Sequence, residues 1–176
     1  MQTMEKPISR WLFVLLMVVV LTGCGTTFLV VPEVSHTGPT ELNMVGRVNY
    51  SSNPDYLPRT VKPSDGASGR LEFKYEYTVG YGQDAVPDVL PLFNPLSLVG
   101  CPIGADSLVV VGKLDILKDG EVVKTYCSTC VIDKTRNLFY EGKTHSELRR
   151  EGLFKVRDNI EAQMANGRET LLELVQ

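Results

Sequence analysis

The sequence predicts an α+β domain in which an antiparallel sheet of four or five strands packs against one C-terminal helix. Two patterns carry this prediction. Apolar and polar side chains alternate strictly over residues 70–81, which is typical of a strand with one solvated face. From residue 144 onward the apolar side chains instead recur at helical spacing. We expect the helix to cover the apolar face of the sheet.

The segment 70–81 (RLEFKYEYTVGY) is the clearest strand in the chain. Charged or small residues separate its apolar ones, so the aromatic side chains share one face. That face is formed by Leu71, Phe73, Tyr75, Tyr77, Val79 and Tyr81.

A hairpin is expected after this strand. Residues 107–118 predict a well-buried strand, and Asp119-Gly120 predicts a tight turn because both residues tolerate a positive φ. The returning strand covers 121–126 and extends to Val131 if the register holds. We also expect four further elements: a first strand at 41–50, a loop at 51–69, a turn at 133–137 and a last strand at 138–140.

The C-terminal helix has a predicted start and end. Thr144 and Glu147 have the spacing of a capping box, and Gly167 is suited to the left-handed residue that closes a helix. Residues 171–175 form a short apolar tail, as either strand or helix. The residues expected to face the sheet are Leu148, Leu153, Val156, Ile160 and Met164.

The N-terminus predicts export. A short segment with Lys6 and Arg10 precedes eleven apolar residues, 11–21, followed by small residues. Because a membrane-spanning helix needs about 20 apolar residues, this run is short for a permanent anchor.

The end of this run, Leu21-Thr22-Gly23-Cys24, resembles the lipobox of bacterial lipoproteins. The resemblance implies that the signal is cut before Cys24 and that Cys24 carries a diacylglycerol and an N-acyl chain. Gly25 stands where an aspartate would signal inner-membrane retention, so the outer membrane is favoured, with the domain on its periplasmic face. We therefore expect a signal peptide at 1–23, a lipidated tether at 24–40 and one globular domain at 41–176. Within the tether, residues 28–31 could pair as a short edge strand.

Three cysteines remain after lipidation, Cys101, Cys127 and Cys130, so at most one intramolecular disulfide is expected. Cys127 and Cys130 form a CxxC motif, which in thioredoxin-like enzymes lies where a strand meets a helix. No helical pattern follows here, and we favour a structural bridge, either Cys127–Cys130 or Cys101 to one of them, over redox catalysis or zinc binding. We expect no metal site. The net charge of −3 provides no electrostatic basis for binding nucleic acid.

Residues 85–104 are strongly apolar, yet their four prolines exclude a long helix or a central strand. We expect part of this stretch to pack on the domain. Leu92, Phe93 and Leu96 are candidates for contact with another envelope protein.

These features favour a non-enzymatic envelope lipoprotein, an accessory or scaffold in outer-membrane assembly, transport or maintenance. One alternative is a periplasmic thiol–disulfide protein that uses Cys127 and Cys130. Another is a lipoprotein that binds a small ligand between the helix and the tyrosine strand.

Overall fold

The computed structural model describes residues 25–35, 42–64, 71–83, 104–136 and 142–175. These belong to two compact units. The larger unit comprises residues 28–81, 108–132 and 145–176, and holds most of the sheet and both helices. In the smaller unit, the described residues are the strand ends at 25–27, 82–83, 104–107 and 133–136, with 142–144.

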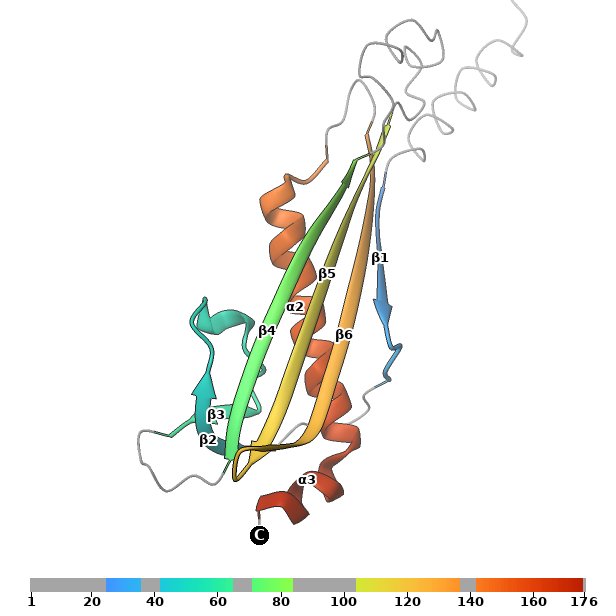
Figure 1. Ribbon diagram of the computed structural model, residues 1–176. Coiled ribbons are helices and arrows are strands. Elements are labelled where there is room, and N and C mark those ends of the chain that lie inside the picture. The colour runs from blue at the N-terminus through green and yellow to red at the C-terminus, as the bar shows by residue number, and fades with distance from the viewer. Residues whose placement is uncertain (1–24, 36–41, 65–70, 84–103, 137–141, 176) are drawn as a thin grey trace, which may run out of the picture. The chain divides into compact units, whose positions relative to one another are not determined.

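The fold is α+β, as predicted, with a six-stranded sheet in the order β1-β6-β5-β4-β2-β3 (Figure 1). The long strands β4, β5 and β6 form its centre. The strands are β1 (Thr26–Val31), β2 (Met44–Asn49), β3 (Val61–Pro63), β4 (Leu71–Gln83), β5 (Gly104–Lys118) and β6 (Glu121–Arg136).

The predicted strand count and antiparallel character are only partly right, because the sheet has six strands instead of four or five and is mixed. β2 pairs in parallel with both β3 and β4. The expected loop at 51–69 contains a short 3-10 helix, η1 (Pro54–Tyr56), and then β3. Residues 50–60 therefore act as a crossover connection, which parallel neighbours require. β3 has only three residues and ends in a proline, too short a pattern to be recognised in the sequence.

β5 and β6 form the predicted hairpin. Asp119 has φ of 54° and Gly120 has φ of 86°, the two positive values of a tight hairpin turn. β6 runs to Arg136, so the turn predicted at 133–137 is wrong for residues 133–136. The strand predicted at 138–140 lies outside the described residues.

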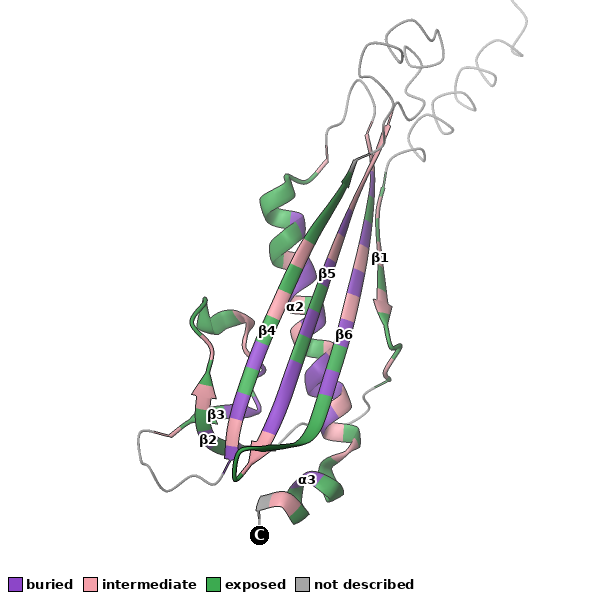
Figure 2. Ribbon diagram, viewed as in Figure 1, coloured by how far each residue is buried: buried purple, intermediate pink, exposed green. Residues whose placement is uncertain are grey.

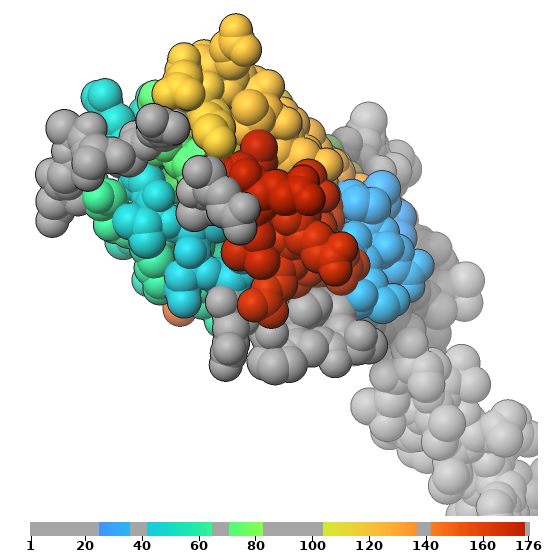
Figure 3. All heavy atoms as spheres, turned by 90° about the horizontal axis from the view of Figure 1, so that it is seen from below, coloured from blue at the N-terminus to red at the C-terminus, as the bar shows by residue number. Residues whose placement is uncertain are grey.

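Helix α2 (His145–Asn166) covers one face of the sheet and starts directly after Thr144, as predicted. All five residues expected to face the sheet are buried. Figure 2 shows buried positions recurring along α2. Gly167 separates α2 from a second helix, α3 (Arg168–Val175), so the prediction of one helix is also corrected. α3 lies beside the end of the hairpin (Figure 3), where Lys118 Nζ donates a hydrogen bond to the Leu174 carbonyl at 2.9 Å.

Two glycines bring α2 close to the sheet. A Cβ on Gly112 of β5 would overlap Val156 Cγ1 and lie 3.2 Å from the Tyr75 hydroxyl. From the other side, a Cβ on Gly152 of α2 would lie 2.8 Å from Val110 Cγ2 and 2.9 Å from Ile132 Cδ1. Helix and sheet therefore approach as closely as they do because both positions lack a side chain.

β1 changes the expectation of a tether at 24–40. Residues 26–31 are a sheet strand beside β6. Phe28 and Val30 pack against the core, whereas Leu29 and Val31 are exposed, as a period of two requires. The structure therefore has a strand where the sequence allowed a short edge strand at 28–31, and this strand starts two residues earlier.

Gly112→Ala should destabilise the protein by about 1–3 kcal/mol, because an added methyl group overpacks a well-filled interface. The matched control is Gly80→Ala in β4, where the nearest atom to an added Cβ is the Val109 carbonyl oxygen at 4.0 Å. Urea unfolding measures both. Equal stability of the two variants would contradict the close approach at Gly112.

Candidate functional site

Strand β4 extends well beyond its neighbour β2. The parallel ladder joins Arg47 to Glu72 and ends where Asn49 faces Lys74. Within the described residues, no strand lies beside Tyr75–Tyr81 on this side, whereas β5 lies on the other. We call this seven-residue segment the β4 edge. An open strand edge presents unpaired N–H and C=O groups that another extended chain can bind.

A cleft of about 430 Å³ opens at the base of the β4 edge, where the chain leaves β2. It is bounded by two short segments, one following β2 and one in β4. The lining residues are Asn49, Tyr50, Ser51, Ser52, Lys74, Tyr75, Glu76 and Tyr77. No residue of α2 lines this cleft, so it differs from the predicted pocket between the helix and the tyrosine strand.

Aromatic side chains line the helix side of the β4 edge. Tyr56 of η1 meets Tyr77 edge-on at 6.2 Å between ring centroids, and lies 5.5 Å from Phe154 of α2. Tyr81 meets His145 edge-on at 6.1 Å. The rings come from three separate elements, which is why the sequence did not show them as a group.

Hydrogen bonds fix Tyr77 in this group. Its hydroxyl lies 3.0 Å from Ser52 Oγ. The bond to Ser52 and a second one to Arg149 lower the pKa of Tyr77 from its ordinary value, while burial raises the pKa of neighbouring Tyr75.

Arginine side chains of α2 also lie on the helix side of the β4 edge. The guanidinium carbons of Arg150 and Arg157 lie 5.4 and 4.8 Å from the Phe154 ring centroid. Arg149 and Arg150 are exposed. The β4 edge therefore combines backbone groups that have no strand beside them in the described part of the chain with an aromatic and basic border.

The opposite face of the sheet is polar near the cleft. Lys74 and Glu76 form an exposed ion pair at 2.7 Å. On the next strand, burial alone would raise the pKa of Asp115, but hydrogen bonds from Lys113 Nζ (2.7 Å) and Thr125 Oγ1 (2.6 Å) lower it overall. This network satisfies a buried carboxylate and needs no ligand to do so.

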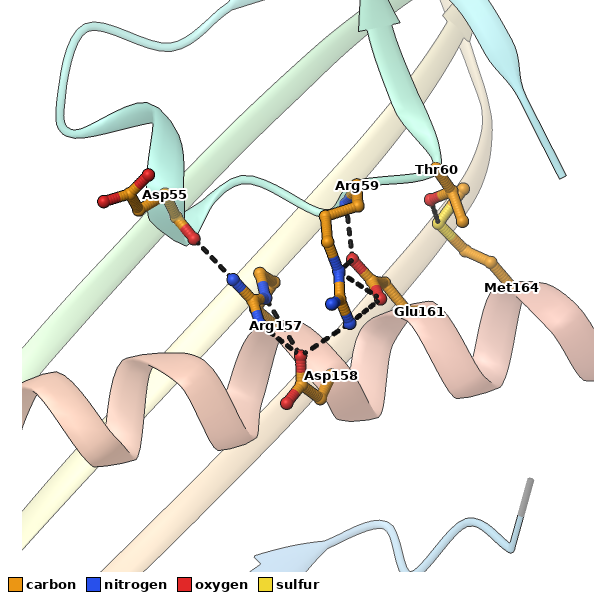
Figure 4. Close-up of polar contacts among 7 residues, drawn as sticks. All are labelled: Asp55, Arg59, Thr60, Arg157, Asp158, Glu161 and Met164. Atoms are coloured by element: carbon orange, nitrogen blue, oxygen red, sulfur yellow. Dashed lines mark hydrogen bonds and ion pairs between the residues drawn. The ribbon is translucent and has the colours of Figure 1, made fainter. Parts of the chain in front are cut away.

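The crossover that forms one end of the cleft is held to α2 by a clasp, shown in Figure 4. Glu161, on the buried side of α2, accepts hydrogen bonds from the backbone N–H of Arg59 and from its guanidinium, with Nη2 to Oε2 at 2.8 Å. Arg59 also reaches Asp158 at 3.3 Å. Arg157 donates to the Asp55 carbonyl at 2.7 Å. These contacts, which we call the clasp, hold the crossover at residues 50–60 against α2.

Glu161→Gln should reduce stability by about 1–3 kcal/mol, because hydrogen bonds to a charged group are among the stronger ones and Glu161 is largely buried. The control is Glu173→Gln on the exposed side of α3. Urea midpoints measure both changes. Glu161→Gln without loss of stability would show that the clasp does not hold the crossover.

The two cysteines of the CxxC motif lie within β6 and point to opposite faces. Cys127 is exposed and Cys130 is fully buried, and both are free thiols. Three strand steps span about 10 Å, whereas a disulfide requires Cα atoms within roughly 7 Å. The Cys127–Cys130 option is therefore excluded in this strand. Because both thiols are free, the structure also holds no bridge from Cys101 to either of them, and Cys101 itself lies outside the described residues.

The two thiols should differ sharply in reactivity. Burial raises the pKa of Cys130, so its thiolate is scarce as well as inaccessible. In a Cys101→Ser background, native protein should react with a maleimide at Cys127 and should leave Cys130 unmodified until it unfolds. Peptide mass spectrometry reads the result, with Cys127→Ser as control. Rapid native labelling of Cys130 would contradict its burial.

Cys24, Leu92, Phe93 and Leu96 also lie outside the described residues, so their predicted roles remain predictions. Within the described residues, no cluster of three or more His, Cys, Asp or Glu side chains is arranged to hold a metal ion. No helix in this part of the chain is long and apolar enough to cross a membrane. Comparison with protein-family models and with curated protein sequences gives no match to the chain.

Proposed function

We propose that this protein is a non-enzymatic, lipid-anchored accessory of the cell envelope that binds an extended segment of another polypeptide along the β4 edge. The observation that carries the proposal is the open backbone of Tyr75–Tyr81 beside a cleft. A chain added there would hydrogen-bond to the edge, which provides affinity, while neighbouring side chains provide selectivity.

A comparison of strand β3 with the β4 edge supports the β4 edge as the binding site. The outermost strand, β3, is only three residues long and contains Lys62 and Pro63, two features that discourage further pairing. The β4 edge lacks such protection over Tyr77–Tyr81, which carries no charge and no proline. An edge left open in this way is suited to a partner.

The border of the β4 edge indicates the chemistry of the segment. Tyr77 and Phe154 offer aromatic surface, and Arg149 and Arg150 offer positive charge. A segment that alternates apolar side chains with acidic ones would match both. We propose such a segment, from a protein of outer-membrane assembly, transport or maintenance, as the partner.

The proposed location in the cell envelope rests on the sequence alone. The basic, apolar leader and Leu21-Thr22-Gly23-Cys24 support a lipid anchor at Cys24, in the outer membrane and facing the periplasm. Leu92, Phe93 and Leu96 remain candidates for a second contact with the same envelope partner. A thiol–disulfide activity is not favoured, because Cys127 and Cys130 do not face one another.

Replacing Cys24 with Ala should give an unlipidated precursor that keeps its leader, since the lipobox cysteine is the acceptor. Intact-mass spectrometry of membrane-extracted protein measures this. Wild-type protein that carries no acyl chains at Cys24 would refute the lipid anchor.

Binding at the β4 edge is tested by photo-crosslinking in cells. A benzophenone amino acid at Thr78, which is exposed on β4, should crosslink to a second polypeptide, and mass spectrometry of the adduct should locate an extended segment in it. The control position is Val122, exposed at the start of β6. Equal crosslinking at both positions would contradict a site on β4.

Charge reversal tests the basic border. Arg149→Glu with Arg150→Glu should reduce the Thr78 crosslink several-fold, because border charges chiefly steer association and are each worth up to about 1 kcal/mol. The matched control is Arg168→Glu, an exposed arginine on α3. If the double change left the crosslink unaffected, the inference that the partner segment is acidic would be refuted.

A further inference from the structure

Gly25, the residue directly after Cys24, is held at the end of the sheet by β6. Its N–H donates a hydrogen bond to Thr135 Oγ1 at 3.1 Å, and its carbonyl accepts one from the Thr135 N–H, also at 3.1 Å. The Thr135 hydroxyl donates to the same carbonyl at 3.2 Å. Both backbone groups of Gly25 are therefore bound to one residue, and β1 starts with the next residue, Thr26.

This arrangement leaves almost no free chain between a lipid on Cys24 and the sheet. Adjacent Cα atoms are about 3.8 Å apart. A flexible tether over 24–40 would instead have a root-mean-square reach of roughly 20–25 Å. The difference decides whether the folded protein moves freely above the bilayer or stands on it.

We propose that the Gly25–Thr135 contact makes the strand ends around it a membrane-facing surface, held against the lipid headgroups. This inference rests on the proposed lipid anchor at Cys24. The surface comprises Gly25, Asp133, Thr135, Arg136 and the start of β5 at Gly104. Arg136 lies across that start, since a Cβ on Gly104 would be 3.1 Å from its Nε. A guanidinium in this position is suited to the phosphate groups of lipids.

Thr135 adjoins Gly25 through tertiary structure alone, because the two residues are 110 positions apart in the chain. A probe on β6 thus reports the contact itself and not mere proximity along the chain. Asp133 is exposed and serves as the labelling position.

The experiment uses the full-length lipidated protein in vesicles of phosphatidylethanolamine and phosphatidylglycerol containing a headgroup nitroxide lipid. A fluorescent amino acid replaces Asp133. Nitroxide should quench it strongly in the otherwise wild-type chain. An eight-residue Gly-Ser insertion between Cys24 and Gly25, which adds a reach of roughly 15 Å, should reduce the quenching at least two-fold.

Thr135→Val removes the hydroxyl that binds Gly25 and should reduce the quenching partly. Thr129→Val, another threonine of β6, is the matched control and should leave it unchanged. Equal quenching with and without the insertion, or none in the acylated wild-type chain, would overturn this inference and leave the lipid anchor standing. Mass spectrometry showing no acyl chains at Cys24 would overturn both.

Discussion

The close approach of α2 to β5 at Gly112 and Gly152 is the constraint on which the rest of the structure depends. Side chains at these positions would hold helix and sheet apart, and the apolar contacts on both sides would be lost. With the helix seated, Phe73 and Tyr75 are fully covered, whereas Tyr81 is 54% exposed. The burial of β4 therefore falls along its length, and its far end becomes available as surface.

The candidate site follows from how briefly β2 pairs with β4. Three residues of ladder suffice to place β2 because the crossover behind it is secured independently by Glu161 and Arg59. That bidentate contact is partly buried and joins residues about a hundred positions apart, so it orders the crossover more than an exposed pair would. The chain then leaves the sheet early, and β4 continues without a neighbour on that side in the described part of the structure.

Charged side chains have different neighbours on the two sides of the sheet. On the open face of the sheet, Lys74 pairs with Glu76 and Lys113 with Asp115, residues two apart on the same strand. Such pairs follow from strand geometry and, where exposed, add little stability. The basic residues of α2 instead lie among aromatic rings near β4. The proposed binding surface thus combines rings and cations, a composition that the acidic net charge of the chain does not reveal.

The sequence by itself determined the local elements: the alternating strand predicted at 70–81, the Asp119-Gly120 hairpin, and the helix after Thr144 with its buried stripe. Period and turn chemistry are local properties, so a single segment suffices to reveal them. Tertiary structure alone decided the parallel placement of β2 and β3 and the contact between Gly25 and Thr135. Each of these depends on which distant segment lies alongside, because β-pairing is a contact between strands and its partner is not encoded within either one.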